Sequence, residues 1–217
     1  MSDTPIYHPH PDEHGRKLRL VAPSQERGLA RLADPDASVT FVPGSACADM
    51  LGGVLLAHCS PSAIDRALSG ADAEPIDEPP FVLPAGKQAA AGAVVIEPDG
   101  RIWLVSPSNG FGGYTTTFPK GRACPGASLQ ATALKETWEE SGLRIRLTGW
   151  LGDFSRTQTW TRFYLARRTG GHPADMGWES QAVHLATVAE ARGLLNRATD
   201  QAVLDALVRR LASLAQA

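Results

Sequence analysis

Residues 121–143 read GRACPGASLQATALKETWEESGL, and this stretch decides the fold. Its first part contains glycine and proline, which favour a tight loop. Its remainder is rich in residues that form helices well. The pattern predicts a loop that leads into a helix over residues 127–141, which Gly142 would end in the left-handed conformation.

Three acidic residues of this helix share one face. Glu136, Glu139 and Glu140 stand at positions i, i+3 and i+4, so at about 100° per residue they lie within roughly one turn. Three carboxylates this close repel one another unless a cation neutralises them. Hard oxygen ligands suit Mg²⁺ or Mn²⁺. The alternative is an ordinary solvated helix face, since glutamate is common on surfaces.

The residues around the three glutamates favour the metal site. Ala131, Leu134 and Trp138 recur at helical spacing, which predicts an apolar stripe that holds the helix against a sheet. In the preceding loop, Lys120 and Arg122 supply positive charge where phosphates would approach, although random surface charge is the alternative. A metal beside such a loop can neutralise phosphate oxygens and activate water, as hydrolysis of a diphosphate requires.

The spacing over residues 121–143 closely resembles the Nudix box. That motif reads Gly, five residues, Glu, seven residues, Arg-Glu-aliphatic-any-Glu-Glu-any-Gly-aliphatic. The resemblance extends more weakly from about Ala91 to the C-terminus and does not cover the first eighty-odd residues. It implies an α/β/α sandwich with a mixed β-sheet, a loop-helix-loop catalytic motif, and hydrolysis of nucleoside diphosphates linked to another moiety.

The resemblance also implies roles for single residues. Glu136 and Glu140 match the principal metal ligands, and Glu139 matches the residue that binds metal or serves as the base for the attacking water. Which of Glu139 and Glu140 takes the proton varies within the family, so both stand as catalytic candidates. The main-chain carbonyl of Lys120 resembles a further metal ligand, and Lys120 and Arg122 are expected to bind substrate.

Two positions depart from the motif. Ala127 replaces its first glutamate, and Lys135 replaces its arginine. Lysine keeps the positive charge but lacks the planar fork of arginine, and alanine cannot bind metal. The departures leave the number of metals open, and the three helix glutamates favour retained activity.

Outside the box, four further features bear on the substrate. Residues 118–121 read FPKG and resemble the branch that acts on dinucleoside polyphosphates and diphosphoinositol polyphosphates, with ADP-ribose-type substrates as competitors. Glu179, beside Trp178, stands where some members place an extra catalytic acid, and a solvated loop acid is the alternative. Arg156 and Arg162 flank an expected strand pair from which they could reach phosphates.

The chain divides at a segment rich in proline and acidic residues, residues 71–84. We expect an N-terminal extension over residues 1–84, a small α/β unit plus this linker, and a Nudix hydrolase domain over residues 85–217. The elements expected in the extension are strands over 18–22 and 39–42 and a helix over 61–68. The elements expected in the domain are a hairpin of 91–96 and 101–105 about a turn at 97–100, strands over 143–147, 162–166 and 182–184, and helices over 188–195 and 201–214.

The N-terminus alternates histidine with proline, as in His8, His10 and the later His14. A metal site built from these histidines is one interpretation. A flexible or loosely docked tail is the favoured one, because proline resists regular structure and no acidic or thiolate ligands stand at zinc-like spacing.

The bulk composition narrows the class of protein. Hydrophobic residues make up 43% and charged residues 20%, as in globular proteins. The net charge of -2 and the pI near 6.3 make nucleic-acid binding an unlikely role. Three cysteines without a CxxC pair and the lack of a long apolar run predict a cytoplasmic protein away from membranes. The competing functions are a Nudix-fold nucleotide sensor and an interaction module, and a homodimer is possible.

Overall fold

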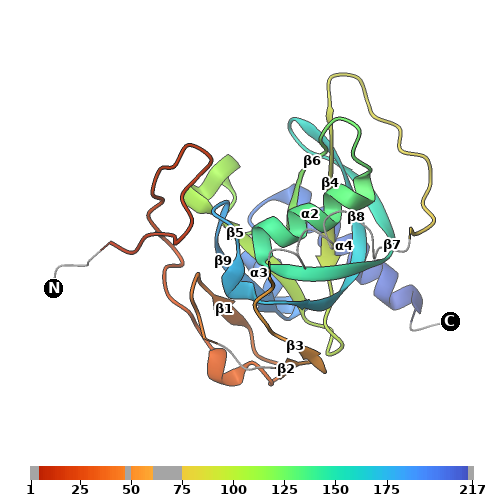
Figure 1. The fold of residues 1–217 in the computed structure, drawn as a ribbon. Helices are drawn as coiled ribbons and strands as arrows, with labels where there is room; N and C mark the ends of the chain where they lie inside the picture. Colours follow the sequence, from red (N-terminus) through yellow and green to blue (C-terminus); the bar gives the residue numbers. More distant parts are fainter. Residues whose placement is uncertain (1–4, 47–49, 61–74, 215–217) are drawn as a thin grey trace.

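The computed structural model describes residues 5–46, 50–60 and 75–214 (Figure 1). The helix expected over residues 61–68 lies outside the described residues, as does Cys47. The elements in chain order are η1 (Leu29–Arg31), β1 (Val39–Phe41), β2 (Met50–Leu51), β3 (Val54–Leu55), β4 (Gln88–Val95), β5 (Ile102–Pro107), η2 (Ser108–Gly113), β6 (Lys120–Arg122), α2 (Leu129–Ser141), β7 (Leu143–Ser155), β8 (Thr159–Gly171), η3 (Pro173–Asp175), β9 (Ser180–Ala186), α3 (Val188–Leu194) and α4 (Ala198–Leu214).

The strands form two main sheets and a small hairpin. The four-stranded sheet has the order β6-β4-β8-β7, the three-stranded sheet has the order β1-β9-β5, and β2 pairs with β3. Strands β4 and β8 run parallel, whereas the other pairs are antiparallel. The expected α/β fold with mixed pairing is therefore confirmed.

The expected hairpin of residues 91–96 and 101–105 is wrong as a paired unit. The turn is present, because the Glu97 amide donates to the Arg101 carbonyl at 2.9 Å, and Ile96 bridges Ile102. Beyond that bridge, β4 pairs with β6 and β8 while β5 pairs with β9. Apolar runs identify strands that are buried on both faces, but they do not identify the partner of each strand.

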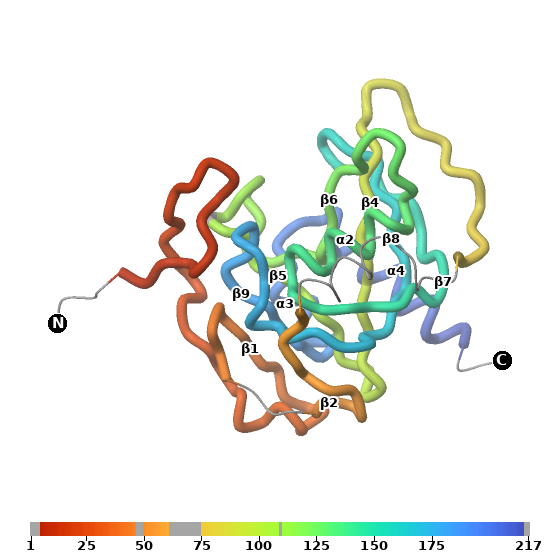
Figure 2. Tube along the Cα trace, in the orientation of Figure 1, coloured from red at the N-terminus to blue at the C-terminus, as the bar shows by residue number. Residues whose placement is uncertain are grey.

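Alternate residues of the strands face two separate cores, which gives the sandwich its layers. Along β4, Ala93 and Val95 belong to the core that α2 covers, and Val94 belongs to the core that α3 and α4 cover. In β5, Trp103 belongs to the core that α2 covers and Leu104 to the core that α3 and α4 cover. Figure 2 shows α2 on one side of the strands and α4 on the other. This arrangement is the α/β/α sandwich.

The N-terminal extension packs into the same structure. Strand β1 pairs with β9, and Phe41, Leu51 and Leu56 lie in the core beneath α2. The boundary proposed at residue 84 therefore separates two parts of the sequence, although the extension and the domain share one hydrophobic core. The strand expected over residues 18–22 is wrong, since among those residues only Arg19 forms a bridge, to Tyr7, within a looped segment.

Candidate active site

Helix α2 holds the glutamate cluster and has defined ends. The side chain of Ser128 accepts a hydrogen bond from the Ala131 amide at 3.1 Å, which caps the first turn. Gly142 ends the helix with φ 66°, as expected for a left-handed cap. The helix begins at Leu129 rather than at Ala127, because Ser128 takes the cap position.

The buried face of α2 differs from the expected apolar stripe. Leu134 is buried, but Ala131 and Trp138 are only half-buried. Fully buried positions include Ala133, a small residue. The remaining buried residues of this face are polar or acidic and include Thr137, Ser141, Glu136 and Glu140. Hydrophobic periodicity could not predict this buried face, because two of its inward-facing side chains are carboxylates.

Glu136 and Glu140 meet β6, a short strand in the segment that was expected to be a loop before the helix. The Lys120 amide donates to Oε2 of Glu140 at 2.7 Å. A Cβ at Gly121 would overlap the Glu136 carboxylate, so only glycine leaves room for it. Helix α2 thus holds the two carboxylates against the first two residues of β6.

Burial changes the protonation of these two groups. It raises the pKa of Glu136 to about 7, and the Glu139 charge adds to the rise while Lys135 opposes it. Burial raises the pKa of Glu140 to about 8 against the opposing charge and amide of Lys120. At neutral pH Glu140 is therefore mostly protonated and Glu136 about half protonated, and a nearby positive charge would ionise both more fully.

Glu139 has a different environment from its neighbours. Its side chain is 39% exposed and pairs with Nζ of Lys135 at 2.5 Å. Lys135 thus supplies a cation at the position where the Nudix box has arginine. Glu139 faces a cavity of about 250 Å³ whose lining residues are His10, Trp138, Glu139, Asp175, Gly177, Trp178 and Glu179.

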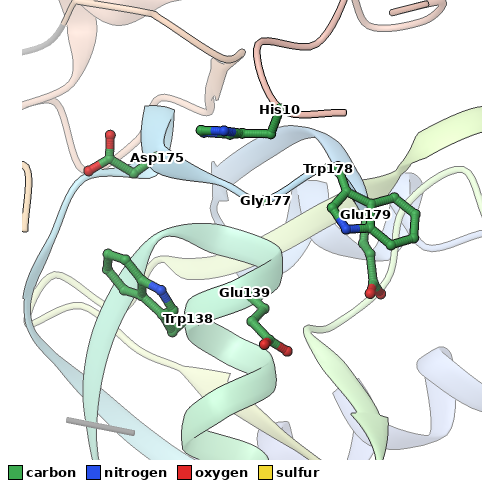
Figure 3. Close-up of a pocket in the computed structure, with 7 residues that line it drawn as sticks. All are labelled: His10, Trp138, Glu139, Asp175, Gly177, Trp178 and Glu179. Carbon is green, nitrogen blue, oxygen red and sulfur yellow. The ribbon is translucent and has the colours of Figure 1, made fainter. Parts of the chain in front are cut away.

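Glu179 enters the same cavity from the loop before β9. In Figure 3, its carboxylate and that of Glu139 extend toward the same region, next to the Trp178 ring. The residue as a whole is exposed, but burial of its carboxylate end and the charge of Glu139 raise its pKa. The structure therefore brings Glu179 to the glutamate cluster.

The two cations of the preceding loop take different positions. Nζ of Lys120 lies 5.1 Å from the centre of the Tyr114 ring, near enough to the glutamates to influence both Glu136 and Glu140. Arg122 is exposed and donates to Oε1 of Gln158 at 2.9 Å. Of these two cations, Lys120 is thus the one whose charge acts on the glutamate cluster.

Arg156 and Arg162 are buried and engaged elsewhere. Arg156 pairs with Asp200 and donates to the Tyr114 hydroxyl at 3.1 Å. Arg162 makes a bidentate pair with Asp153 at 2.7 and 2.8 Å. Neither residue lines the cavity beside Glu139, so we leave both out of the proposed site.

The N-terminal histidines lie in a docked segment, so of the two expected forms, a flexible or a loosely docked tail, the flexible one is wrong. His8 and Asp12 are buried, and the amides of His8 and Leu20 donate to the carbonyls of Leu18 and Ile6 at 2.8 Å each. Among the described residues, the group that could hold a metal includes none of His8, His10 and His14.

Neither His10 nor Asp175 was expected in the cavity wall from the sequence, although His10 was named there as a possible metal ligand. In Figure 3, His10 reaches the cavity from the N-terminal loop, across from Glu139. These residues are far from the glutamates in the chain, and no motif marks them. The histidine-proline alternation was the only available signal for His10.

The glutamate cluster fits a divalent cation. Its donors are carboxylate oxygens, which Mg²⁺ and Mn²⁺ prefer. Gly121 leaves room for the Glu136 carboxylate, and the two buried carboxyls, whose pKa values burial raises, would ionise more readily beside a cation. Glu136, Glu140 and the Lys120 carbonyl are the groups that would hold the ion, with Glu139 beside them.

A sequence profile described as the NUDIX domain matches residues 86–211, more than half of the chain. The chain belongs to the Nudix family. This Nudix chain is also 30% identical over 92 residues to an RNA pyrophosphohydrolase of Caulobacter vibrioides (strain NA1000 / CB15N), a match that covers 42% of the chain and 50% of the relative. The chain thus spans about half the length of the curated relatives it matches.

Solved structures of Nudix-type proteins resemble the present one. An Ap4A hydrolase binary complex of C. elegans is 20% identical with a TM-score of 0.48, covering 57% of this chain and 98% of the other. A MutT protein of Methanosarcina mazei Go1 is 16% identical with a TM-score of 0.47, covering 59% of this chain and 98% of the other. No helix of the described residues is long and apolar enough to cross a bilayer.

Proposed function

We propose that this Nudix protein is a metal-dependent hydrolase that cleaves a diphosphate linkage in a nucleotide-like substrate. The observation that carries the proposal is the convergence of Glu136, Glu139, Glu140 and Glu179 at one end of α2 beside a cavity. Four carboxylates in one place repel one another unless a cation or bound protons neutralise them, and such clusters are typical of functional sites.

The four acids divide into two pairs by environment. Glu136 and Glu140 are buried and fixed by the loop at residues 120–121, as suits ligands of Mg²⁺ or Mn²⁺. Glu139 and Glu179 face the cavity, so either can accept a proton from the attacking water. When bound, the cation supplies positive charge against the phosphate oxygens and makes water more acidic.

The chain's own cations would orient the substrate. Lys120 lies on the loop beside Glu140, where its ammonium group can approach a phosphate. Arg122 is exposed on the same loop and can reach further phosphates of an extended substrate. This arrangement supports a substrate with several phosphates, as the FPKG segment also indicates.

The cavity wall supports a nucleoside as the remaining part of the substrate. Trp138, Trp178 and His10 line it together with the acids (Figure 3). Flat aromatic rings stack on nucleobases, and an indole or imidazole nitrogen can hydrogen-bond to them. Dinucleoside polyphosphates and ADP-ribose-type compounds therefore rank above diphosphoinositol polyphosphates, and the name of the RNA pyrophosphohydrolase relative adds RNA to the candidates.

A substrate panel tests the proposal. The full chain is incubated with Mg²⁺ or Mn²⁺ and a panel of compounds, and the products are separated by chromatography. The panel contains dinucleoside polyphosphates, ADP-ribose, diphosphoinositol polyphosphates, RNA, NADH, nucleotide sugars and nucleoside triphosphates. We expect hydrolysis of at least one compound, its loss on adding EDTA, and its loss in Glu140→Gln. Glu26→Gln, which changes an exposed glutamate, is the matched control and should retain activity.

One outcome favours the second candidate, a nucleotide sensor. Ala127 leaves the motif one acid short, and a protein that bound a nucleotide tightly without turning it over would fit that loss. Binding without hydrolysis across the whole panel, with either metal present, would overturn the hydrolase proposal.

A further inference from the structure

A second cluster of metal-binding side chains lies away from the four acids. Among the described residues, His58, His172 and Asp175 each offer one ligand atom, and these atoms lie within 4.8 Å of one another. His58 follows β3 in the N-terminal extension, whereas His172 and Asp175 belong to the segment around η3. The cluster therefore joins two parts of the chain that are far apart in sequence.

The three side chains already contact one another. Nδ1 of His58 lies 2.6 Å from Oδ1 of Asp175, which is a short hydrogen bond. The rings of His58 and His172 stack at 4.3 Å with an interplanar angle of 17°. His172 is buried, so its lost water contacts must be replaced by contacts within the protein or with a bound ion.

The cluster combines one fixed side chain with two that can adjust. His172 is buried, and its Nδ1 accepts a hydrogen bond from the Ala174 amide at 3.2 Å, which a metal bond at that nitrogen would replace. The side chain of His58 is 72% exposed and that of Asp175 is 27% exposed, so both can turn without disturbing the core.

We propose that His58, His172 and Asp175 bind one divalent transition-metal ion of the zinc type. Imidazole nitrogens suit Zn²⁺ and its neighbours, whereas Mg²⁺ prefers oxygen ligands. Zn²⁺ takes four ligands at about 2.0–2.2 Å, so a small opening of the His58–Asp175 contact would admit it, and water would complete the shell. When the ion binds Nδ1 of His58, the hydrogen that now bridges His58 and Asp175 leaves that nitrogen. It moves to Nε2 if the ring is neutral and to solvent if both ring nitrogens carry a proton, so the bound ring is neutral in either case.

The position of this site gives the ion a structural consequence. Asp175 also lines the cavity beside Glu139, and the chain runs from it through Trp178 to Glu179. A bound ion would fix this segment to the N-terminal extension. The inference goes beyond the proposed hydrolysis, since the site would bind metal whether or not the protein is an enzyme.

Metal titration in excess Mg²⁺ tests the site without reference to activity. The full chain is stripped of metal with EDTA, and Co²⁺ or Zn²⁺ is added while millimolar Mg²⁺ competes for the glutamates. Visible absorption reports the coordination of Co²⁺, and equilibrium dialysis gives the stoichiometry for Zn²⁺. We expect one equivalent to bind, with the intense absorption of four-coordinate Co²⁺, and Zn²⁺ to raise the thermal midpoint.

Matched variants separate this site from the glutamate cluster. His58→Ala and Asp175→Asn should weaken Zn²⁺ binding by at least about tenfold and abolish the rise in thermal midpoint. His14→Ala, which removes another exposed histidine, and Glu140→Gln should leave both readouts unchanged. His58→Ala removes a mostly exposed ring and is expected to fold.

Three results would overturn the proposal. One is a wild-type protein that binds no Zn²⁺ in excess Mg²⁺. Another is binding that survives in both His58→Ala and Asp175→Asn. The third is binding that disappears in Glu140→Gln, which would place the ion at the glutamate cluster instead.

Discussion

The buried ion pair of Arg168 and Glu97 gives the sharpest stability prediction. Arg168 is buried, and its guanidinium donates to Oε1 of Glu97 at 2.6 Å and to the Leu51 carbonyl at 2.7 Å. Glu97 is 2% exposed and also accepts from Nε1 of Trp103 at 2.7 Å. The pair thus ties β8 to the turn between β4 and β5 and to β2 of the extension.

Arg168→Met would leave the Glu97 carboxylate buried without its cation. Breaking such a pair from one side costs about 3–5 kcal/mol, a large share of the roughly 5–15 kcal/mol that stabilises a domain. Arg192→Met is the matched control, because Arg192 and Asp205 are 50% and 46% exposed and such pairs contribute about 0–1 kcal/mol.

Urea unfolding followed by circular dichroism measures both free energies. We expect Arg168→Met to lower the unfolding free energy by several kcal/mol and Arg192→Met to leave it near the wild-type value. The double variant Glu97→Gln with Arg168→Met should recover part of the loss, because it leaves no buried charge. Equal stabilities for Arg168→Met and Arg192→Met would refute the reasoning. So would a double variant less stable than Arg168→Met alone.

Three further predictions concern pH and the glutamate loop. Burial lowers the pKa of His184 from 6.5 to about 4, so only the unfolded state gains a proton as pH falls through this window. The contribution of His184 to the unfolding free energy should be full above about pH 6.5 and fall by ~3 kcal/mol toward pH 4. The difference between wild type and His184→Gln in urea titrations at several pH values measures it, and a difference that does not change with pH would contradict this. The pKa values of Glu136 and Glu140 are raised to about 7 and about 8, so Mg²⁺ must displace protons when it binds them. Its apparent affinity, measured by calorimetry, should rise with pH and level off above about pH 8. An affinity that does not change with pH would count against these carboxylates as ligands. Gly121→Ala would push the Glu136 carboxylate aside and should reduce Mg²⁺ affinity by at least about tenfold. Gly193→Ala, which has open space at its Cβ, is the control and should leave the affinity unchanged. Equal affinities for the two variants would show that the space at Gly121 is not needed for Mg²⁺ binding.

The sequence predicted the helix and its acids because their determinants are local. Helix propensity, the glycine that ends α2 and the spacing of the three glutamates all lie within one short segment. Even there, the inward direction of Glu136 and Glu140 was missed, since an acidic side chain is expected outside unless something else in the fold requires it.

The sheet partners and the cavity wall could not be predicted in the same way. The pairing of β4 with β8 and of β5 with β9 depends on segments far along the chain, so residues next to the turn at Glu97 carry no sign of it. His10 and Asp175 reach the cavity through the docking of the N-terminal loop and the path of η3. Such contacts arise from tertiary packing, which spacing within one element does not encode.

The pairing of β1 with β9 has a practical consequence for protein production. A fragment limited to residues 86–211, the part that matches the family, would lack β1 and leave one edge of β9 open. An open edge offers unpaired amides and carbonyls to the strands of other chains, and apolar Val183 and Leu185 lie on that strand. The shortened fragment would therefore aggregate more readily than the full chain, even though it contains every residue of the glutamate cluster.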